Sequence, residues 1–220
     1  MTRTVMGVPR FRTFLFEERT SGMYGSFSLR DAPEEMRAFA RVLLYSTDRD
    51  ALYDAAELAV KLYPRSRSLI ERVLFGPDRM ARAQAHSLVF FHFGASSPAE
   101  GMRRSIRKYA IKLAERYLVT LKVDRCSAAY MAADFLGEHC PLYVGRTALM
   151  AIVRKGRYSE GRSASVMRLR DVCERLMKKR SKRAKVELRR IRALLEDLAL
   201  HDRDVNVQSA ARVVLRMVWP

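Results

Sequence analysis

Hydrophobic residues recur along the chain at the spacing of an amphipathic α-helix. In one clear case, Leu169, Val172, Cys173 and Leu176 stand at positions i, i+3, i+4 and i+7, which places them on one side of a helix. Similar stripes between Gly, Pro and polar turn residues predict ten helices, each with a buried and a solvated face. The predicted ranges are 33–46, 49–63, 66–75, 78–93, 98–120, 124–138, 141–155, 164–180, 183–200 and 203–219.

The connections between these helices are only a few residues long, so neighbours along the chain are expected to pack antiparallel as helical hairpins. The 10 Gly and 7 Pro are too few for an all-β fold with many tight turns, which favours an all-α fold. Residues 162–219 contain neither Gly nor Pro. The predicted helices 164–180 and 183–200 could therefore instead form one continuous helix. The run from Lys178 to Arg183 predicts a break there, because neighbouring like charges oppose helix formation.

Part of the chain repeats. Four predicted helices open with an Asp-Arg pair, and the aspartates are expected to cap them: Asp48, Asp78, Asp124 and Asp202. Small residues follow in the middle of these helices, and two copies carry paired alanines at the same distance from the aspartate: Ala132, Ala133, Ala210 and Ala211. With a further copy near Ser163, the average interval is about 38 residues. We expect the alanines to be buried where helices approach closely.

This period and helix pattern resembles a HEAT-like repeat of paired helices. The stretch from Asp204 to Ala211 matches best, with Asp, Val, a polar residue and then two small residues, and the resemblance covers residues 33–219. It implies an α-solenoid of about five antiparallel helical hairpins, in which each hairpin buries its face on the next. A globular helical bundle with alanine-rich contacts is the alternative. Residues 1–32 are interpreted as a basic and aromatic N-terminal arm, and residues 33–220 as the helical repeat domain.

The positive charge is concentrated in the second half of the chain. The formal net charge is +18, yet residues 1–100 carry 14 basic and 12 acidic groups and residues 101–220 carry 28 and 12. Two segments, 103–125 and 146–192, hold the whole excess. Such a field favours a polyanion, with nucleic acid first and an anionic membrane second; a merely solvated surface is the alternative. Membrane insertion is not expected, because no apolar run is long enough to span a bilayer.

The basic residues of both segments are the predicted nucleic-acid-binding site. They are Arg103, Arg104, Arg107, Lys108, Lys112, Arg154, Lys155, Arg157, Arg162, Lys178, Lys179, Arg180, Lys182, Arg183, Lys185, Arg189 and Arg190. Arg outnumbers Lys, which favours bidentate phosphate contacts. A flexible basic loop is expected between Gly156 and Gly161, where Tyr158 could stack on an unpaired base or simply be a surface tyrosine.

Motifs for catalysis, metal or cofactor binding are missing from the sequence. The three cysteines, Cys126, Cys140 and Cys173, form no Cys-x-x-Cys pair, and the His139-Cys140 pair beside Cys126 is interpreted as ordinary packing. Neither a phosphate-binding loop nor a nucleophile elbow occurs. We therefore predict no catalytic residue, no metal site and no cofactor. Unpaired cysteines indicate a reducing compartment.

One enzyme alternative follows from the scaffold. Some DNA glycosylases for alkylated bases are built on HEAT-like repeats and use aromatic residues and a carboxylate in a concave groove. Asp134 with Tyr130 is the candidate for that role here, although a carboxylate on the helix surface is the simpler interpretation.

The favoured hypothesis is a non-enzymatic structural component of a large ribonucleoprotein, with a mitochondrial ribosome as its specific setting. Residues 101–192 are expected to contact structured RNA, such as ribosomal RNA, by backbone and shape rather than by sequence. The nearly neutral N-terminal half is expected to contact neighbouring proteins. The basic N-terminal arm and the reducing environment predict the mitochondrion or another reducing compartment.

Overall fold

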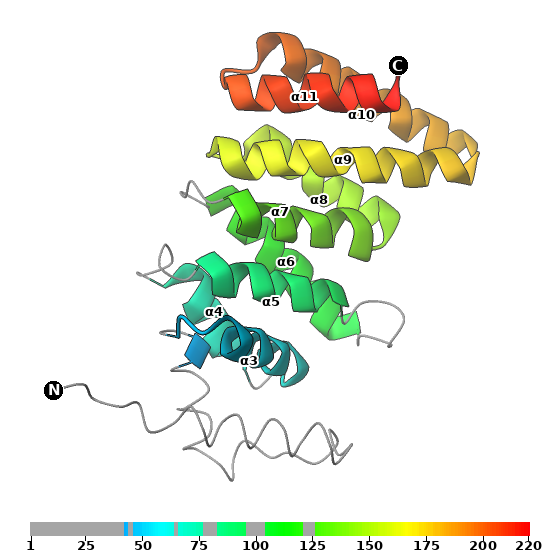
Figure 1. The fold of residues 1–220 in the computed structure, drawn as a ribbon. Helices are drawn as coiled ribbons and strands as arrows, with labels where there is room; N and C mark the ends of the chain where they lie inside the picture. Colours follow the sequence, from blue (N-terminus) through cyan, green and yellow to red (C-terminus); the bar gives the residue numbers. More distant parts are fainter. Residues whose placement is uncertain (1–41, 44–45, 64–65, 77–82, 96–103, 121–125) are drawn as a thin grey trace, which may run out of the picture. The chain divides into compact units, whose positions relative to one another are not determined.

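The computed structural model describes residues 42–43, 46–63, 66–76, 83–95, 104–120 and 126–220. Its contacts divide the chain into two compact units, Met1–His92 and Phe93–Pro220. All regular structure in the described residues is helical, which confirms the all-α prediction (Figure 1). The predicted arm 1–32 and most of helix 33–46 lie outside the described residues, as do the predicted caps Asp78 and Asp124.

The first unit contains α3 (Arg49–Lys61), α4 (Arg67–Phe75) and most of α5 (Ala83–Ala95). Asp48 caps α3 as predicted, because its carboxylate accepts hydrogen bonds from the backbone N–H groups of Asp50 and Ala51. The ring Nε2 of His86 in α5 lies 2.8 Å from the carbonyl oxygen of Val73 in α4 and links the two helices.

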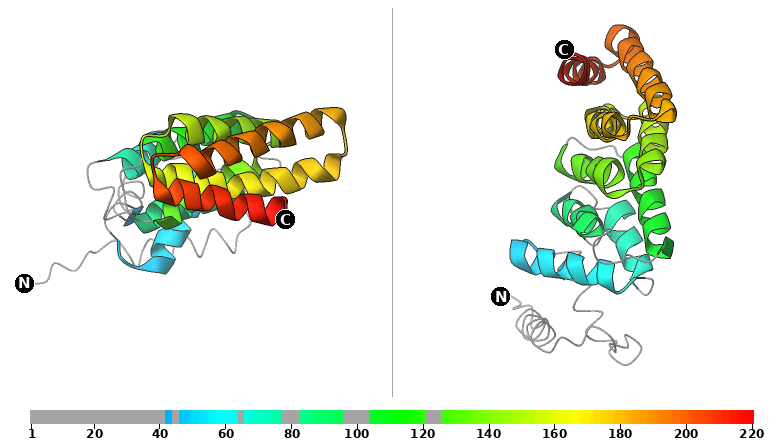
Figure 2. Two further views of the ribbon diagram at one scale, coloured as in Figure 1. Left: turned by 90° about the horizontal axis from the view of Figure 1, so that it is seen from above. Right: turned by 90° about the vertical axis from the view of Figure 1, so that its right-hand side faces the viewer.

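The second unit contains α6 (Arg104–Thr120), α7 (Cys126–Asp134), the π-helical turn η2 (Phe135–His139), α8 (Leu142–Lys155), α9 (Ser159–Lys179), α10 (Lys182–His201) and α11 (Val205–Val218). Helix α9 is central and packs against α7, α8, α10 and α11. Figure 2 shows this unit in two layers, with α7, α9 and α11 in one and α6, α8 and α10 in the other. Whether these layers form HEAT-like repeats stays a prediction.

Small residues set the spacing between helices of the second unit. Ala132, Ala133 and Ala211 are fully buried and Ala210 is 8% exposed, which confirms the prediction made from their positions. Glycine also allows close contact: a Cβ at Gly161 of α9 would collide with the backbone carbonyl oxygen of Leu118 in α6. The main chains of α6 and α9 therefore touch directly.

The predicted break between the long helices is confirmed. Arg180 ends α9 in the left-handed region, with φ 48°, and Ser181 caps α10 by accepting a hydrogen bond from the N–H of Ala184. The like charges of this run and the serine cap therefore end one helix and begin the next.

Two predicted boundaries are wrong. Helix α9 begins at Ser159 rather than 164, so Gly161 is helical and does not belong to a flexible loop. Helix α11 begins at Val205, and its cap is Asp204, whose carboxylate accepts from the N–H of Asn206. Asp202, the predicted cap, instead ends α10 and binds an arginine of α9.

None of the helices in the described residues combines the length and apolar character that crossing a membrane requires.

Candidate nucleic-acid interface

The residues between α9 and α10 form a dense group of exposed cations, here called the basic turn: Lys178, Lys179, Arg180, Lys182 and Arg183. The last turn of α9 supplies the first two, and the first turn of α10 supplies the last two. All five side chains are solvent-exposed. The left-handed Arg180 and the Ser181 cap hold these two helix ends against each other, so the charges gather at one end of the second unit (Figure 1).

Among the described residues, no carboxylate neutralises the cations of the basic turn. Within the part of the chain that the structure describes, Lys178, Lys179, Arg180 and Lys182 take part in no ion pair. The Arg183 guanidinium lies 4.0 Å from the centroid of the Tyr143 ring, a cation–π contact that connects the turn to α8. Within the described residues, the positive charge at this end of the unit is therefore not balanced by ion pairs.

The location of these charges opposes helix stability. Positive side chains at the end of α9 suit its dipole, but Lys182 and Arg183 stand at the positive N-terminus of α10, whose first turn has no acidic residue. Each unfavourable cation costs about 0.3–1 kcal/mol at an exposed helix end. These cations thus increase the positive charge of the surface and lower the stability of α10.

Cations of α10 and α8 extend the charged surface. Lys185 and Arg189 are exposed on α10, and Arg154, Lys155 and Arg157 are exposed at and beyond the end of α8.

Tyr158 is the N-cap residue of α9, in the short connection that follows α8. Its ring is half-buried and lies 5.6 Å from the guanidinium of Arg157. Stacking of this ring on a base stays a prediction.

Arg162 is a correction to the predicted site. It is only 7% exposed, and its Nε donates to the carbonyl oxygen of Val153 at 2.8 Å. Its two terminal nitrogens donate to the two carboxylate oxygens of Asp202, one of them at 3.1 Å. The guanidinium is thus committed to joining α9 with the end of α8 and the α10–α11 turn, so it is not available for phosphate.

The predicted stripe on α6 is described only in part. Lys108 and Lys112 are exposed and Arg107 is half-buried. Arg103 and the side chain of Arg104 lie outside what the structure describes.

Cys140 and Cys173 are free thiols, and both are buried. Burial raises the pKa of the Cys140 thiol to about 12, although the nearby charges of Arg107 and Arg175 oppose the shift. Burial likewise raises the pKa of Cys173 to about 12, and Glu174 and Asp171 add to the effect. Both thiols are therefore held in the protonated form near neutral pH, in which a thiol is a poor nucleophile.

Asp134, the acid proposed for the glycosylase alternative, forms an ion pair with Arg168. The carboxylates of Asp134 and Glu138 and the ring of His139 lie near one another, within 4.8 Å. The guanidinium of Arg168 binds Asp134 at 3.1 Å and Asp171 at 3.1 Å, and it lies 3.7 Å from Glu138. One guanidinium is therefore shared among three carboxylates and compensates only part of their negative charge.

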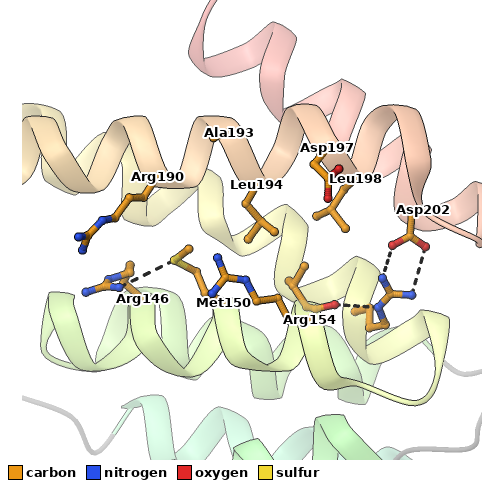
Figure 3. A pocket seen from close by; sticks show the side chains of 11 residues that line it. Arg146, Met150, Arg154, Arg190, Ala193, Leu194, Asp197, Leu198 and Asp202 are labelled. Atoms are coloured by element: carbon orange, nitrogen blue, oxygen red, sulfur yellow. Dashed lines mark hydrogen bonds and ion pairs between the residues drawn. The ribbon is translucent and has the colours of Figure 1, made fainter.

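A groove that the sequence did not predict lies between α8 and α10 (Figure 3). Its floor is apolar, with Met150 and Val153 from α8 and Leu194 and Leu198 from α10. These residues come from helices more than 40 positions apart, so their meeting left no local signal. The only local sign of this groove is that Arg146 and Met150 stand one helical turn apart on α8, which places an arginine next to an apolar side chain.

Comparisons with known protein families, with curated proteins and with solved structures found no match. The HEAT-like resemblance therefore depends on the repeat pattern of this chain alone.

Proposed function

We propose that the protein is a non-enzymatic RNA-binding component of a large ribonucleoprotein, which contacts the RNA backbone through the basic turn and the exposed cations of α8 and α10. The basic turn is the observation that supports this most strongly. Five exposed cations lie within six consecutive residues, and the described residues supply no carboxylate to four of them.

Phosphate is the partner that such a surface suits. Exposed ammonium and guanidinium groups release the counterions of a nucleic acid when they bind it, and this release drives association. The cations of the basic turn lower the stability of α10. Charges that oppose folding are more easily explained by binding of an external anion than by a role in stability. RNA is favoured because backbone and shape can be contacted without a base-reading helix or sheet.

The mitochondrial ribosome is the setting we infer from the sequence. The inference combines the local basicity with the Arg- and Phe-containing N-terminal segment and the unpaired cysteines. Copurification with ribosomal RNA in a nuclease-sensitive particle tests it.

The direct test is the salt dependence of RNA binding. Changing all five residues of the basic turn to Gln is expected to weaken binding of a structured RNA and to flatten the plot of log affinity against log salt. Each lost phosphate contact lowers the slope by about 0.7–0.9, so the total change for five contacts is up to about 4.5.

A matched variant controls for overall charge. It replaces five exposed cations elsewhere with Gln: Arg49, Lys61, Arg67, Arg72 and Arg216. We expect this variant to keep a slope close to that of the wild type. Equal slopes for the two variants would show that the basic turn is only a solvated surface.

A further inference from the structure

The groove between α8 and α10 has a volume of about 770 Å³ and combines an apolar floor with an arginine rim. Met150, Leu194 and Leu198 are 5%, 9% and 6% exposed, so only a small part of each side chain faces the groove. A volume in the range of about 300–1,000 Å³ with an apolar lining and a few polar groups is typical of small-ligand sites. The groove is therefore large enough for one nucleotide.

The arginine rim carries more positive than negative charge. Figure 3 shows Arg146 and Arg190 together at one end, on opposite walls, with Arg154 extending along the groove. One carboxylate, that of the 5% exposed Glu187, serves both end arginines, 3.3 Å from Arg146 and 3.1 Å from Arg190. Arg154 forms no ion pair in the described part of the chain. Two guanidiniums thus share one carboxylate at this end, and Arg154 adds a third positive charge along the groove.

The acidic residues at the other end offset only part of this excess. Asp202 is paired with Arg162, so these two charges cancel. Asp197 is exposed and lies 3.2 Å from the ring of His201. An anion is therefore attracted to the end formed by Arg146 and Arg190.

The same end of the groove continues into the basic turn. Arg183, Glu187 and Arg190 stand at i, i+4 and i+7 on α10, so they share the helix face that lines the groove. Opposite them, Tyr143 precedes Arg146 by three residues on α8, and Arg183 packs on the Tyr143 ring. A strand that lies on the basic turn would reach the groove directly.

We propose that this groove receives one unpaired nucleotide of the bound RNA, with its base on Met150 and Leu194 and its phosphate at Arg146, Arg154 and Arg190. The inference rests on the proposed RNA-binding function. Charge supports a phosphate, because a planar guanidinium matches two phosphate oxygens. The apolar floor supports a base, because a base is stabilised by packing on apolar side chains more than by nearby charge.

The experiment compares two single strands of equal charge by fluorescence anisotropy at one salt concentration. One is a uridine RNA of about 12 nucleotides, and the other is a ribose-phosphate strand of the same length without bases. The full-length protein is expected to bind the uridine strand about tenfold more tightly, because one enclosed base contributes that much. Leu194→Gln is expected to abolish the preference and to keep the affinity for the abasic strand.

Leu200→Gln is the matched control, because Leu200 lies on the same helix and is 70% exposed. It is expected to keep the preference. Should Leu194→Gln fail to fold, Arg154→Ala provides the test. It should weaken uridine binding more than Arg157→Ala does, because both are exposed arginines of the proposed RNA-binding surface and only Arg154 lines the groove. Equal losses in these two variants would overturn the proposal.

The outcomes separate the two proposals. If the wild type binds both strands equally well, the groove does not hold a base, while the RNA-binding function stands. Binding of neither strand would overturn both. A preference that survives Leu194→Gln would place the base elsewhere. Tighter binding of an acidic amphipathic peptide than of uridine RNA, lost in Leu194→Gln, would assign the groove to a protein partner and overturn the nucleotide proposal.

Discussion

The buried pair of Arg162 and Asp202 allows a quantitative test of how the C-terminal helices are held together. Their side chains are 8% and 4% exposed, and the guanidinium also donates to the carbonyl oxygen of Val153. Arg162→Met would keep the aliphatic volume but leave a buried carboxylate without its partner. Breaking a buried pair in this way costs about 3–5 kcal/mol of unfolding free energy.

A second variant separates the charge from the hydrogen bonds. Asp202→Asn keeps an oxygen that can accept from the N–H of Asp204, 3.0 Å away, but it removes the negative charge beside Arg162. The expected cost is smaller, about 1.5–3 kcal/mol, the value of a hydrogen bond to a charged group. In the double variant no charge is left unpaired, so its cost should be less than the sum of the single costs.

Trp219 provides the assay. It is the only tryptophan in the chain and directly follows α11, so its fluorescence during urea unfolding reports the end of the molecule that the pair connects. Glu196→Gln is the control, because it breaks an exposed ion pair. The side chains of Arg192 and Glu196 are 53% and 50% exposed, so losing this pair should lower the unfolding free energy by at most about 0.5 kcal/mol. A cost below about 1 kcal/mol for Arg162→Met, or additive costs in the double variant, would refute the reasoning.

Two further predictions concern the packing of the second unit. Ala133→Leu should lower the unfolding free energy by about 1–3 kcal/mol in the same urea assay, because Ala133 is fully buried and three extra carbons overpack the contact; an unchanged midpoint would contradict the close approach. In a Cys126→Ser background, Cys140 and Cys173 should not react with a thiolate-specific reagent at pH 8 until urea unfolds the protein, since burial raises the pKa of each thiol to about 12. Rapid labelling of the folded protein would show that these thiols are accessible.

The helices could be predicted because the signals that define them are local. Amphipathic stripes, the Asp48 cap and the Lys178–Arg183 break each depend on residues within a turn or two of one another, and the structure confirms them. The boundary errors arose where a distant contact overrides a local rule. Gly161 suggested a loop, yet it lies inside α9, where it allows the main chain of α6 to approach.

For the candidate site, the sequence determined the charge, and the tertiary structure decided which charges face solvent. The clustering of Lys178 to Arg183 is a property of the chain, because consecutive residues at a helix break stay together in any fold. By contrast, Arg162 and Asp202 are 40 residues apart, so only folding could reveal that this arginine is neutralised. The groove likewise exists only because α8 and α10 place Met150 and Leu194 on facing walls, and a contact between distant helices leaves no periodic trace in either one.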